Sequence, residues 1–291
     1  MDRIAGFYRF LWPFLGADDS QVGWLDENTG GRPNREFLAE IPARYGIGPG
    51  MTLLDLGCGK GRKACELAKQ LGCRVIGVDA LPGTLELAHA RISSEGLEGQ
   101  VTLVCGSMDA LPLPDASIDF VWCRDTLNHT SDMARTLAEC ARVLRRGGRM
   151  MNYSALRTDW LEPGEERRLT QPLGINPATL VDTHVSDAFN SAGLRIIEHA
   201  ATDQRDSGYH EELDQNGGRD VMRLARILHA RERITALIGA EDYERLVAYY
   251  LWNSYLLIGK LTYGVWVVEL GDGTASRRIP PGPLDLDASG L

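Results

Sequence analysis

One stretch near the start of the chain, residues 53–62, constrains the fold more than any other. It reads L-L-D-L-G-C-G-K-G-R, an apolar run with one acidic residue that ends in three glycines spaced two apart. The apolar run predicts a buried strand, and residues 60–71 predict the helix that follows it. Glycines at such a strand-to-helix turn let a ligand lie against the backbone, as nucleotides do in doubly wound α/β folds.

The glycine spacing distinguishes between kinds of nucleotide ligand. A dinucleotide fingerprint needs a third glycine at position 62, where Arg62 stands, and Lys60 is not placed for a phosphate-binding P-loop. The pattern D-x-G-x-G-x-G from Asp55 to Gly61 instead resembles motif I of the class I methyltransferases that use S-adenosylmethionine. In that family the acidic residue receives the ammonium of the cofactor's amino-acid tail, directly or through water.

A second strand, residues 74–79, ends in Asp79, 20 positions beyond Gly59. An acidic residue at about this distance, roughly 20 positions on, is placed to bond ribose hydroxyls. The alternative interpretation of Asp79 is an N-cap for a helix that begins near Pro82.

Later segments extend the resemblance in the expected order. Residues 101–106 predict a third strand, and residues 107–115 after it resemble the adenine-side loop of the family. Residues 117–124 resemble its fourth strand, and R-V-L-R-R-G-G at 142–148 resembles the segment before its fifth strand. The resemblance covers residues 50–156 closely and 177–270 more loosely.

The resemblance implies S-adenosyl-L-methionine as cofactor and S-adenosyl-L-homocysteine as product. Ser107 stands where the family usually has the acid that accepts the adenine amino group, and Asp109 is the candidate substitute. Met108 is the expected apolar neighbour of the adenine ring. The cofactor-binding residues that we expect are Asp55, Gly57, Cys58, Gly59, Asp79, Ala80, Ser107, Met108, Asp109 and Arg124.

The resemblance also implies the fold. We expect an α/β protein with a doubly wound, mostly parallel seven-stranded sheet of order 3-2-1-4-5-7-6, its seventh strand antiparallel. The charged, Pro- and Gly-containing residues 156–176 are expected to form a loop after the fifth strand. The predicted domains are an aromatic-rich N-terminal helical cap (1–46), a cofactor-binding core (47–202 and 261–271), a helical lid (203–260) and a disordered tail (272–291).

The predicted lid is much longer than the hairpin that would join strands six and seven, and such long connections are usually functional. Residues 221–237 and 241–258 both show helical apolar spacing. Trp252 and Tyr255 share one helical face and are candidates for substrate contact, with core packing as the alternative.

The catalytic assignment rests on one histidine. His129 follows the fourth strand together with Asn128, and an imidazole titrates near neutral pH, so His129 is a candidate general base. The alternative is that His129 caps or packs at the start of the next helix. The substrate-binding residues that we expect are Tyr8, Asn128, His129, His210, Trp252 and Tyr255.

Composition limits the partners and the compartment. The net charge of −9 argues against a nucleic-acid substrate, and the basic clusters 142–149 and 223–233 are interpreted as solvated helix faces. No apolar run reaches the roughly 18 residues of a membrane span, and the start lacks the pattern of an export leader. The six cysteines include no C-x-x-C pair, so reduced thiols in a cytoplasmic protein without a metal site are expected.

We therefore expect an S-adenosylmethionine-dependent methyltransferase that acts on an O, N or C atom of a small, hydrophobic or aromatic natural product. The missing glycine at position 62 disfavours a nicotinamide-dependent reductase. A cyclase or decarboxylase that keeps the cofactor stays an alternative, as does a non-catalytic partner subunit. The aromatic N-terminal segment also allows a homodimer.

Overall fold

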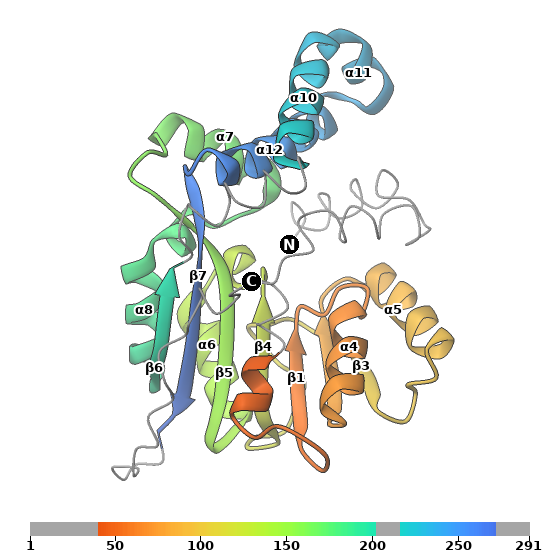
Figure 1. The fold of residues 1–291 in the computed structure, drawn as a ribbon, viewed down its shortest axis with the longest axis vertical. Helices are drawn as coiled ribbons and strands as arrows, with labels where there is room; N and C mark the ends of the chain where they lie inside the picture. The colour runs from red at the N-terminus through yellow and green to blue at the C-terminus, as the bar shows by residue number, and fades with distance from the viewer. Residues whose placement is uncertain (1–39, 202–215, 272–291) are drawn as a thin grey trace, which may run out of the picture. The chain divides into compact units, whose positions relative to one another are not determined.

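The computed structural model describes residues 40–201 and 216–271 of the chain. Its strands form one sheet in the order β3-β2-β1-β4-β5-β7-β6, in which β7 runs antiparallel to its neighbours (Figure 1). The strands are β1 (Thr52–Leu56), β2 (Arg74–Asp79), β3 (Val101–Cys105), β4 (Ile118–Arg124), β5 (Leu144–Arg157), β6 (Leu194–Ala201) and β7 (Leu261–Leu270). The predicted fold class and strand order are confirmed.

The described residues divide into two compact units, and each is described by itself. The sheet unit comprises residues 40–154, 182–200 and 264–271, with helices α4 (Arg62–Leu71), α5 (Pro82–Ser94), α6 (Met133–Val143) and α8 (Asp182–Ser191) and the short 3-10 helix η1 (Leu127–His129). The helical unit comprises 155–181, 201 and 216–263, with α7 (Pro163–Leu173), η2 (Pro177–Leu180), α10 (Asn216–His229), α11 (Arg231–Ile238) and α12 (Ala240–Leu257).

The centre of the sheet unit is a set of fully buried parallel strands. All five residues of β1 are buried, as expected for a strand covered on both faces. β1 pairs in parallel with β2 and β4, and its Leu53 lies between Val75 and Phe120 in that register. Because the strands are parallel, their carboxyl ends meet at one edge of the sheet, where the glycine turn, the end of β2 and the end of β4 come together.

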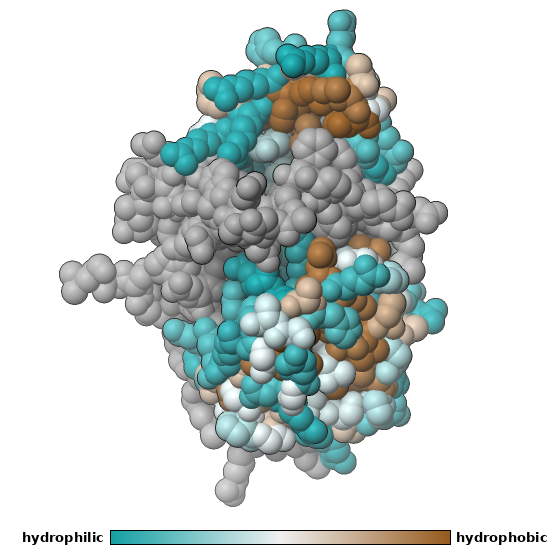
Figure 2. All heavy atoms as spheres, turned by 90° about the vertical axis from the view of Figure 1, so that its right-hand side faces the viewer, coloured by the Kyte–Doolittle hydropathy of each residue, from teal (hydrophilic) through white to brown (hydrophobic). Residues whose placement is uncertain are grey.

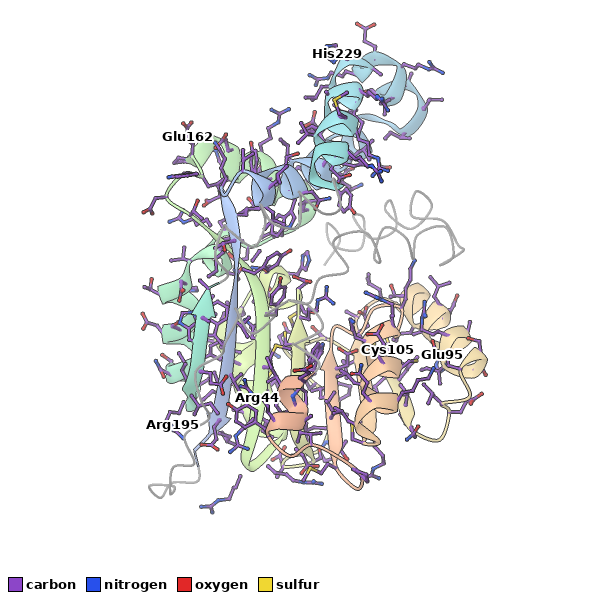
Figure 3. All side chains as sticks on the ribbon, viewed as in Figure 1. Arg44, Glu95, Cys105, Glu162, Arg195 and His229 are labelled. Atoms are coloured by element: carbon purple, nitrogen blue, oxygen red, sulfur yellow. The ribbon has the colours of Figure 1, made fainter. Side chains whose placement is uncertain are left out.

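The opposite edge of the sheet carries acids that are paired with arginines. Asp119 accepts a hydrogen bond from the backbone N–H of Thr52 at 2.7 Å and pairs with Arg145. Glu269 pairs with Arg149 at 2.7 Å and also with Arg195, which Figure 3 labels at this edge. These contacts connect the amino-terminal ends of β1, β4, β5 and β6 with the carboxyl end of the antiparallel β7, and this edge is called the amino-terminal edge of the sheet.

The helical unit has an apolar core of its own. Side chains of α7, α10 and α12 form it, including Leu169, Leu224, Val247 and Leu251. Other apolar side chains of α10 and α11, such as Met222 and Leu237, are exposed. On the face that Figure 2 draws, apolar surface lies beside strongly polar surface.

Two local predictions were wrong. Residues 163–173 form α7 and not a loop, because Pro163 occupies its first turn and Glu162 and Glu165 form a capping box there. The helix expected over 221–237 is two helices, α10 and α11, with Ala230 between them.

Three of the predicted domains lie wholly or partly outside the described residues. The parts outside are most of the N-terminal cap (1–46), residues 202–215, which include most of the first part of the lid, and the tail (272–291). The division into cap, core, lid and tail stays a prediction.

Candidate functional site

Two glycines of the turn after β1 have different surroundings. Gly57 has a φ of 75°, and a Cβ atom there would lie 2.3 Å from Oγ1 of Thr126, so only glycine fits. Gly59 has a φ of 54°, but no atom beyond its chain neighbours lies within 4 Å of its Cβ position in the described chain. The backbone N–H groups of Gly57 and Cys58 both donate to the carbonyl oxygen of Val78. The turn is therefore fixed against β2 and leaves open space at Gly59.

Asp79 ends β2 and holds the same turn. One carboxylate oxygen accepts from the backbone N–H of Gly59 at 3.0 Å, and the other accepts from Leu81 N–H at 2.9 Å. Burial raises the pKa of Asp79, and these backbone hydrogen bonds oppose the shift. The N-cap residue of α5 is Leu81, with no side-chain cap, so the alternative that Asp79 is an N-cap was wrong.

Asp55 is the most deeply buried acid of the site, with 4% of its surface exposed. Its Oδ2 atom is buried and has no hydrogen-bond partner within the described chain. Burial, and then the charge of Asp79, raise the pKa of Asp55 to about 7, against the opposing charges of Arg124 and Lys63. A buried acid, Asp55, and a half-buried acid, Asp79, therefore converge on the glycine turn, an arrangement that favours binding of a cation.

The end of β4 brings a charged residue to the same edge. The Arg124 side chain is 14% exposed, and its Nε lies 3.3 Å from Oδ2 of Asp125. Asp125 has a φ of 56°, which is uncommon for a residue other than glycine, and its N–H donates to Tyr153 O at 2.8 Å. Asn128 and His129 follow in η1, where Asn128 is buried and His129 is half-buried.

The loop after β3 is a tight turn. Ser107 Oγ donates to the carboxylate of Asp109, and Ala110 N–H donates to the carbonyl oxygen of Ser107 at 3.2 Å. Met108 is half-buried between them. Arg135 of α6 donates through Nε to the carbonyl oxygen of Asp109 at 2.8 Å, which ties the turn to the helix.

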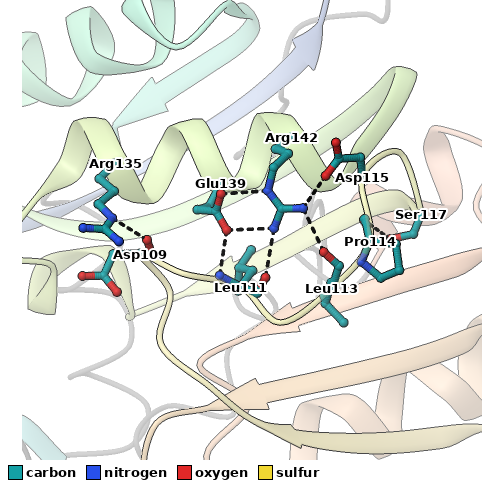
Figure 4. A network of polar contacts seen from close by, with 9 residues as sticks. All are labelled: Asp109, Leu111, Leu113, Pro114, Asp115, Ser117, Arg135, Glu139 and Arg142. Atoms are coloured by element: carbon teal, nitrogen blue, oxygen red, sulfur yellow. Dashed lines mark hydrogen bonds and ion pairs between the residues drawn. The ribbon is translucent and has the colours of Figure 1, made fainter.

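One arginine of α6 holds the rest of this loop. Arg142 donates to the carbonyl oxygens of Leu111 at 2.9 Å and Leu113 at 2.8 Å, and to the carboxylate of Asp115 at 2.6 Å (Figure 4). Glu139 pairs with Arg142 and accepts from the backbone N–H of Leu111 at 2.8 Å. The interpretation of residues 142–149 as a solvated helix face was therefore wrong, because Arg142 bonds to this loop and residues 144–149 belong to β5.

The structure brings the predicted cofactor-binding residues to one edge of the sheet unit. They lie near the end of β1 and in the turn after it, at the end of β2, in the loop after β3 and at the end of β4: Asp55, Gly57, Cys58, Gly59, Asp79, Ala80, Ser107, Met108, Asp109 and Arg124. His129 lies on the segment that follows β4 but does not cap the next helix. Asp132 caps α6, its side chain accepting from Arg135 N–H at 3.0 Å.

The other predicted substrate contacts belong to the helical unit or lie outside the described residues. Trp252 and Tyr255 belong to α12 of the helical unit, where Tyr255 is buried in the apolar core and Trp252 packs against it. Core packing, the alternative given for both, accounts for Tyr255. Tyr8 and His210 lie outside the described residues.

Sequence reasoning missed three contributors to the site. Thr126 fills the space above Gly57, and Glu139 and Arg142 anchor the loop after β3. The motif R-V-L-x-x-G-G could have indicated Arg142, since it recurs in the family at this place, but its role depends on a loop nearly 30 residues earlier.

Within the described part of the chain, no group of three or more His, Cys, Asp or Glu side chains could hold a metal ion. No helix within residues 40–201 and 216–271 has the length and apolar character needed to cross a membrane.

The chain is similar in sequence to known proteins. Residues 54–152 match a family described as a methyltransferase domain. The chain is 34% identical over 189 residues to O-methyltransferase resE of Aspergillus sclerotiorum, which covers 63% of this chain and 70% of that protein. It is 36% identical over 152 residues to 27-O-demethylrifamycin SV methyltransferase of Amycolatopsis mediterranei, covering 51% of this chain and 54% of that protein.

A solved structure is similar over most of the chain. The crystal structure of the [4+2]-cyclase SpnF superposes with a TM-score of 0.65 at 20% identity, covering 82% of this chain and 81% of that one. The chain spans about half the length of the first curated relatives that it matches.

Proposed function

Because the chain belongs to the class I S-adenosylmethionine-dependent methyltransferases, we propose that it methylates an O, N or C atom of a small, hydrophobic or aromatic, natural-product-like molecule. Its cofactor is S-adenosylmethionine, and S-adenosylhomocysteine is the product. Two relatives support the substrate class, since one is named an O-methyltransferase and the other acts on a demethylrifamycin.

The observation that carries the proposal is the acidic pair at the open glycine turn, of which Asp55 is buried and Asp79 half-buried. Asp55 has an oxygen without a partner in the described chain, and the space at Gly59 is empty of protein atoms. The cofactor's ammonium would supply the missing partner of Asp55, and its tail and ribose need open backbone, so the residues fit the group. Asp79 would accept from the ribose hydroxyls.

The rest of the cofactor would be held by the loop after β3. Met108 would lie against the adenine ring, and Ser107 with Asp109 would accept from the adenine amino group. The cofactor supplies an electrophilic methyl group on a sulfonium. The chain's residues have to hold the acceptor in line and remove its proton where the acceptor has one.

We propose His129 as the proton acceptor, with Asn128 beside it in η1. The half-buried position of His129, directly after the strand that carries Arg124, supports this role. An acceptor that carries no acidic proton would need His129 only as part of the wall of its site.

We also propose that the helices between β6 and β7 contribute acceptor contacts, with Trp252 as the first candidate because it is only partly buried. Trp252→Ala should then raise the Michaelis constant of the acceptor by about tenfold or more, given the ~1.5–3 kcal/mol of a large buried apolar side chain. An unchanged Michaelis constant with a lowered thermal midpoint would assign Trp252 to the core alone.

The proposed setting is a cytoplasmic enzyme that acts on small molecules, and that forms a homodimer through its aromatic N-terminal segment. The six cysteines are free, as in a reducing compartment, and the net charge of −9 does not favour nucleic acid. Sedimentation equilibrium of the full chain and of a variant lacking residues 1–39 tests the dimer.

Transfer of a labelled methyl group tests the function. Pools of small molecules are incubated with labelled S-adenosylmethionine, and labelled products are identified by mass spectrometry, with a Gly59→Asn variant as the blank. Labelled product that depends on the wild-type chain identifies the acceptor and the methylated atom. Tight cofactor binding with an unlabelled but altered product would instead favour the cyclase or decarboxylase alternative.

A further inference from the structure

Strand register places three polar side chains on one face of the sheet. Asp55 of β1 pairs with Trp122 of β4, and Arg124 lies two residues further along β4. Because side chains alternate between the faces of a strand, Asp55, Trp122 and Arg124 point to the same face. They approach the edge of the sheet where β1 gives way to the glycine turn.

Each of these side chains has a buried polar atom without a hydrogen-bond partner within residues 40–201 and 216–271. The atoms are Asp55 Oδ2, Trp122 Nε1 and Arg124 Nε. The contact between Arg124 and Asp125, at 3.3 Å, joins it to a carboxylate that is 44% exposed and does not complete a hydrogen bond to Nε. Buried polar groups are rarely left unpaired, so three together at the end of two strands indicate a polar ligand.

The charges of the group match one kind of ligand. Arg124 is close enough to Asp55 for its charge to act on that carboxylate, yet no ion pair joins the two in the described chain. An α-amino acid group carries an ammonium and a carboxylate side by side. A guanidinium recognises a carboxylate well, because its N–H groups can bond both carboxylate oxygens.

We propose that Arg124 binds the carboxylate of the cofactor's amino-acid tail while Asp55 binds its ammonium. The inference rests on the proposed cofactor site and adds a residue that fixes the orientation of the tail. Arg124 would then determine specificity for ligands with an intact amino-acid group.

Calorimetric titration with three ligands tests this role. S-adenosylhomocysteine has the whole tail, decarboxylated S-adenosylhomocysteine keeps the amine alone, and methylthioadenosine has neither charge. Arg124→Gln should weaken binding of S-adenosylhomocysteine about 10- to 100-fold, the range for charge-assisted hydrogen bonds. Its affinity for the other two ligands should change less than about threefold, which is within the scatter of such comparisons.

A matched control lies on the same sheet. Arg145→Gln removes a guanidinium that pairs with Asp119 at the opposite edge, and it should leave all three affinities unchanged. Wild-type protein should bind S-adenosylhomocysteine more tightly than the decarboxylated ligand. The ratio of these two affinities should equal the factor by which Arg124→Gln weakens binding of S-adenosylhomocysteine. This comparison uses wild-type protein alone and so does not depend on the folding of a variant. The affinity of Arg124→Lys for S-adenosylhomocysteine should lie between those of wild type and Arg124→Gln.

Three results would overturn the inference. An equal loss for all three ligands would make Arg124 a structural residue, and unchanged binding of S-adenosylhomocysteine would place it away from the tail. A change confined to the Michaelis constant of the acceptor would assign Arg124 to the substrate. Wild-type protein that fails to bind S-adenosylhomocysteine would contradict the cofactor site itself, which is a separate outcome from the loss of discrimination.

Discussion

The two edges of the sheet use the same kinds of residue in opposite ways. At the amino-terminal edge, Asp119 and Glu269 each contact an arginine, and Asp119 also accepts from a backbone N–H. At the carboxyl edge, Asp55 and Arg124 lie on one face without an ion pair between them, and each keeps a buried atom unpaired in the described chain.

The difference indicates which edge contributes to stability and which edge binds a ligand. Removing one partner of a buried ion pair destabilises the fold, whereas a buried charge that has no partner costs free energy until a ligand supplies one. Substitutions at the amino-terminal edge should therefore lower stability and spare binding. Substitutions at the carboxyl edge should do the reverse.

The largest expected effect is at Gly59. Asparagine tolerates a positive φ better than other side chains, and the space around the Cβ position is open, so Gly59→Asn should fold. Its side chain would occupy the space expected for the cofactor, and affinity for S-adenosylhomocysteine should fall by more than about 100-fold, or ~2.8 kcal/mol. Titration calorimetry and circular dichroism measure the two properties.

Gly57→Ala is the matched control. Its Cβ would meet Thr126, so this variant should lose stability rather than binding alone. A Gly59→Asn variant that still gains thermal stability from the cofactor would show that the turn is not the site.

Asp79→Ala should cost about 2–3 kcal/mol of affinity, because the proposed bonds from the ribose hydroxyls to its carboxylate are lost. Its stability should change little, because removal of a half-buried charge offsets the loss of the bonds from Gly59 and Leu81. Asp119→Ala, at the other edge, should instead lower the free energy of unfolding and keep the affinity. If both variants behave alike, the two edges do not differ in the way described.

Glu269→Gln should have the smallest effect of the substitutions. It weakens pairing with Arg149 and Arg195, and partial exposure of both arginines screens the loss to about 1–2 kcal/mol of stability. Denaturant unfolding measures this change, and cofactor affinity should stay at the wild-type value. A loss of affinity would mean that the amino-terminal edge also shapes the site.

The sequence predicted the sheet because its strands are short apolar runs whose ends carry glycine or an acid. The sequence did not predict α7. This helix has few buried residues, Leu169, Thr170 and Leu173, and it packs against α12, which lies far along the chain. No Gly or Pro marks the break at Ala230.

The candidate site was also predicted only in part from the sequence. Motif spacing identified Asp55, Gly59 and Asp79, because the family repeats that spacing. The unpaired atoms of Trp122 and Arg124 follow only from strand register and burial, which no local pattern encodes.

The central claim is that buried Asp55 ionises to receive the cofactor's ammonium. In the folded protein, the pKa of Asp55 is raised from its ordinary value near 4 to about 7. Protonated Asp55 therefore contributes stability to the unliganded protein that is fully present below about pH 4, and this contribution is lost as pH rises through 7. Binding would require the ionised form. Affinity should therefore fall with decreasing pH below 7.

The most direct test is the affinity for S-adenosylhomocysteine between pH 5.5 and 7, measured by calorimetry for wild type and Asp55→Asn. The account predicts that wild-type affinity falls by about tenfold per pH unit below 7, because binding must then release a proton. Asp55→Asn should bind weakly and with no such slope. Wild-type affinity that is constant over this range, or an equal slope in Asp55→Asn, would contradict the account.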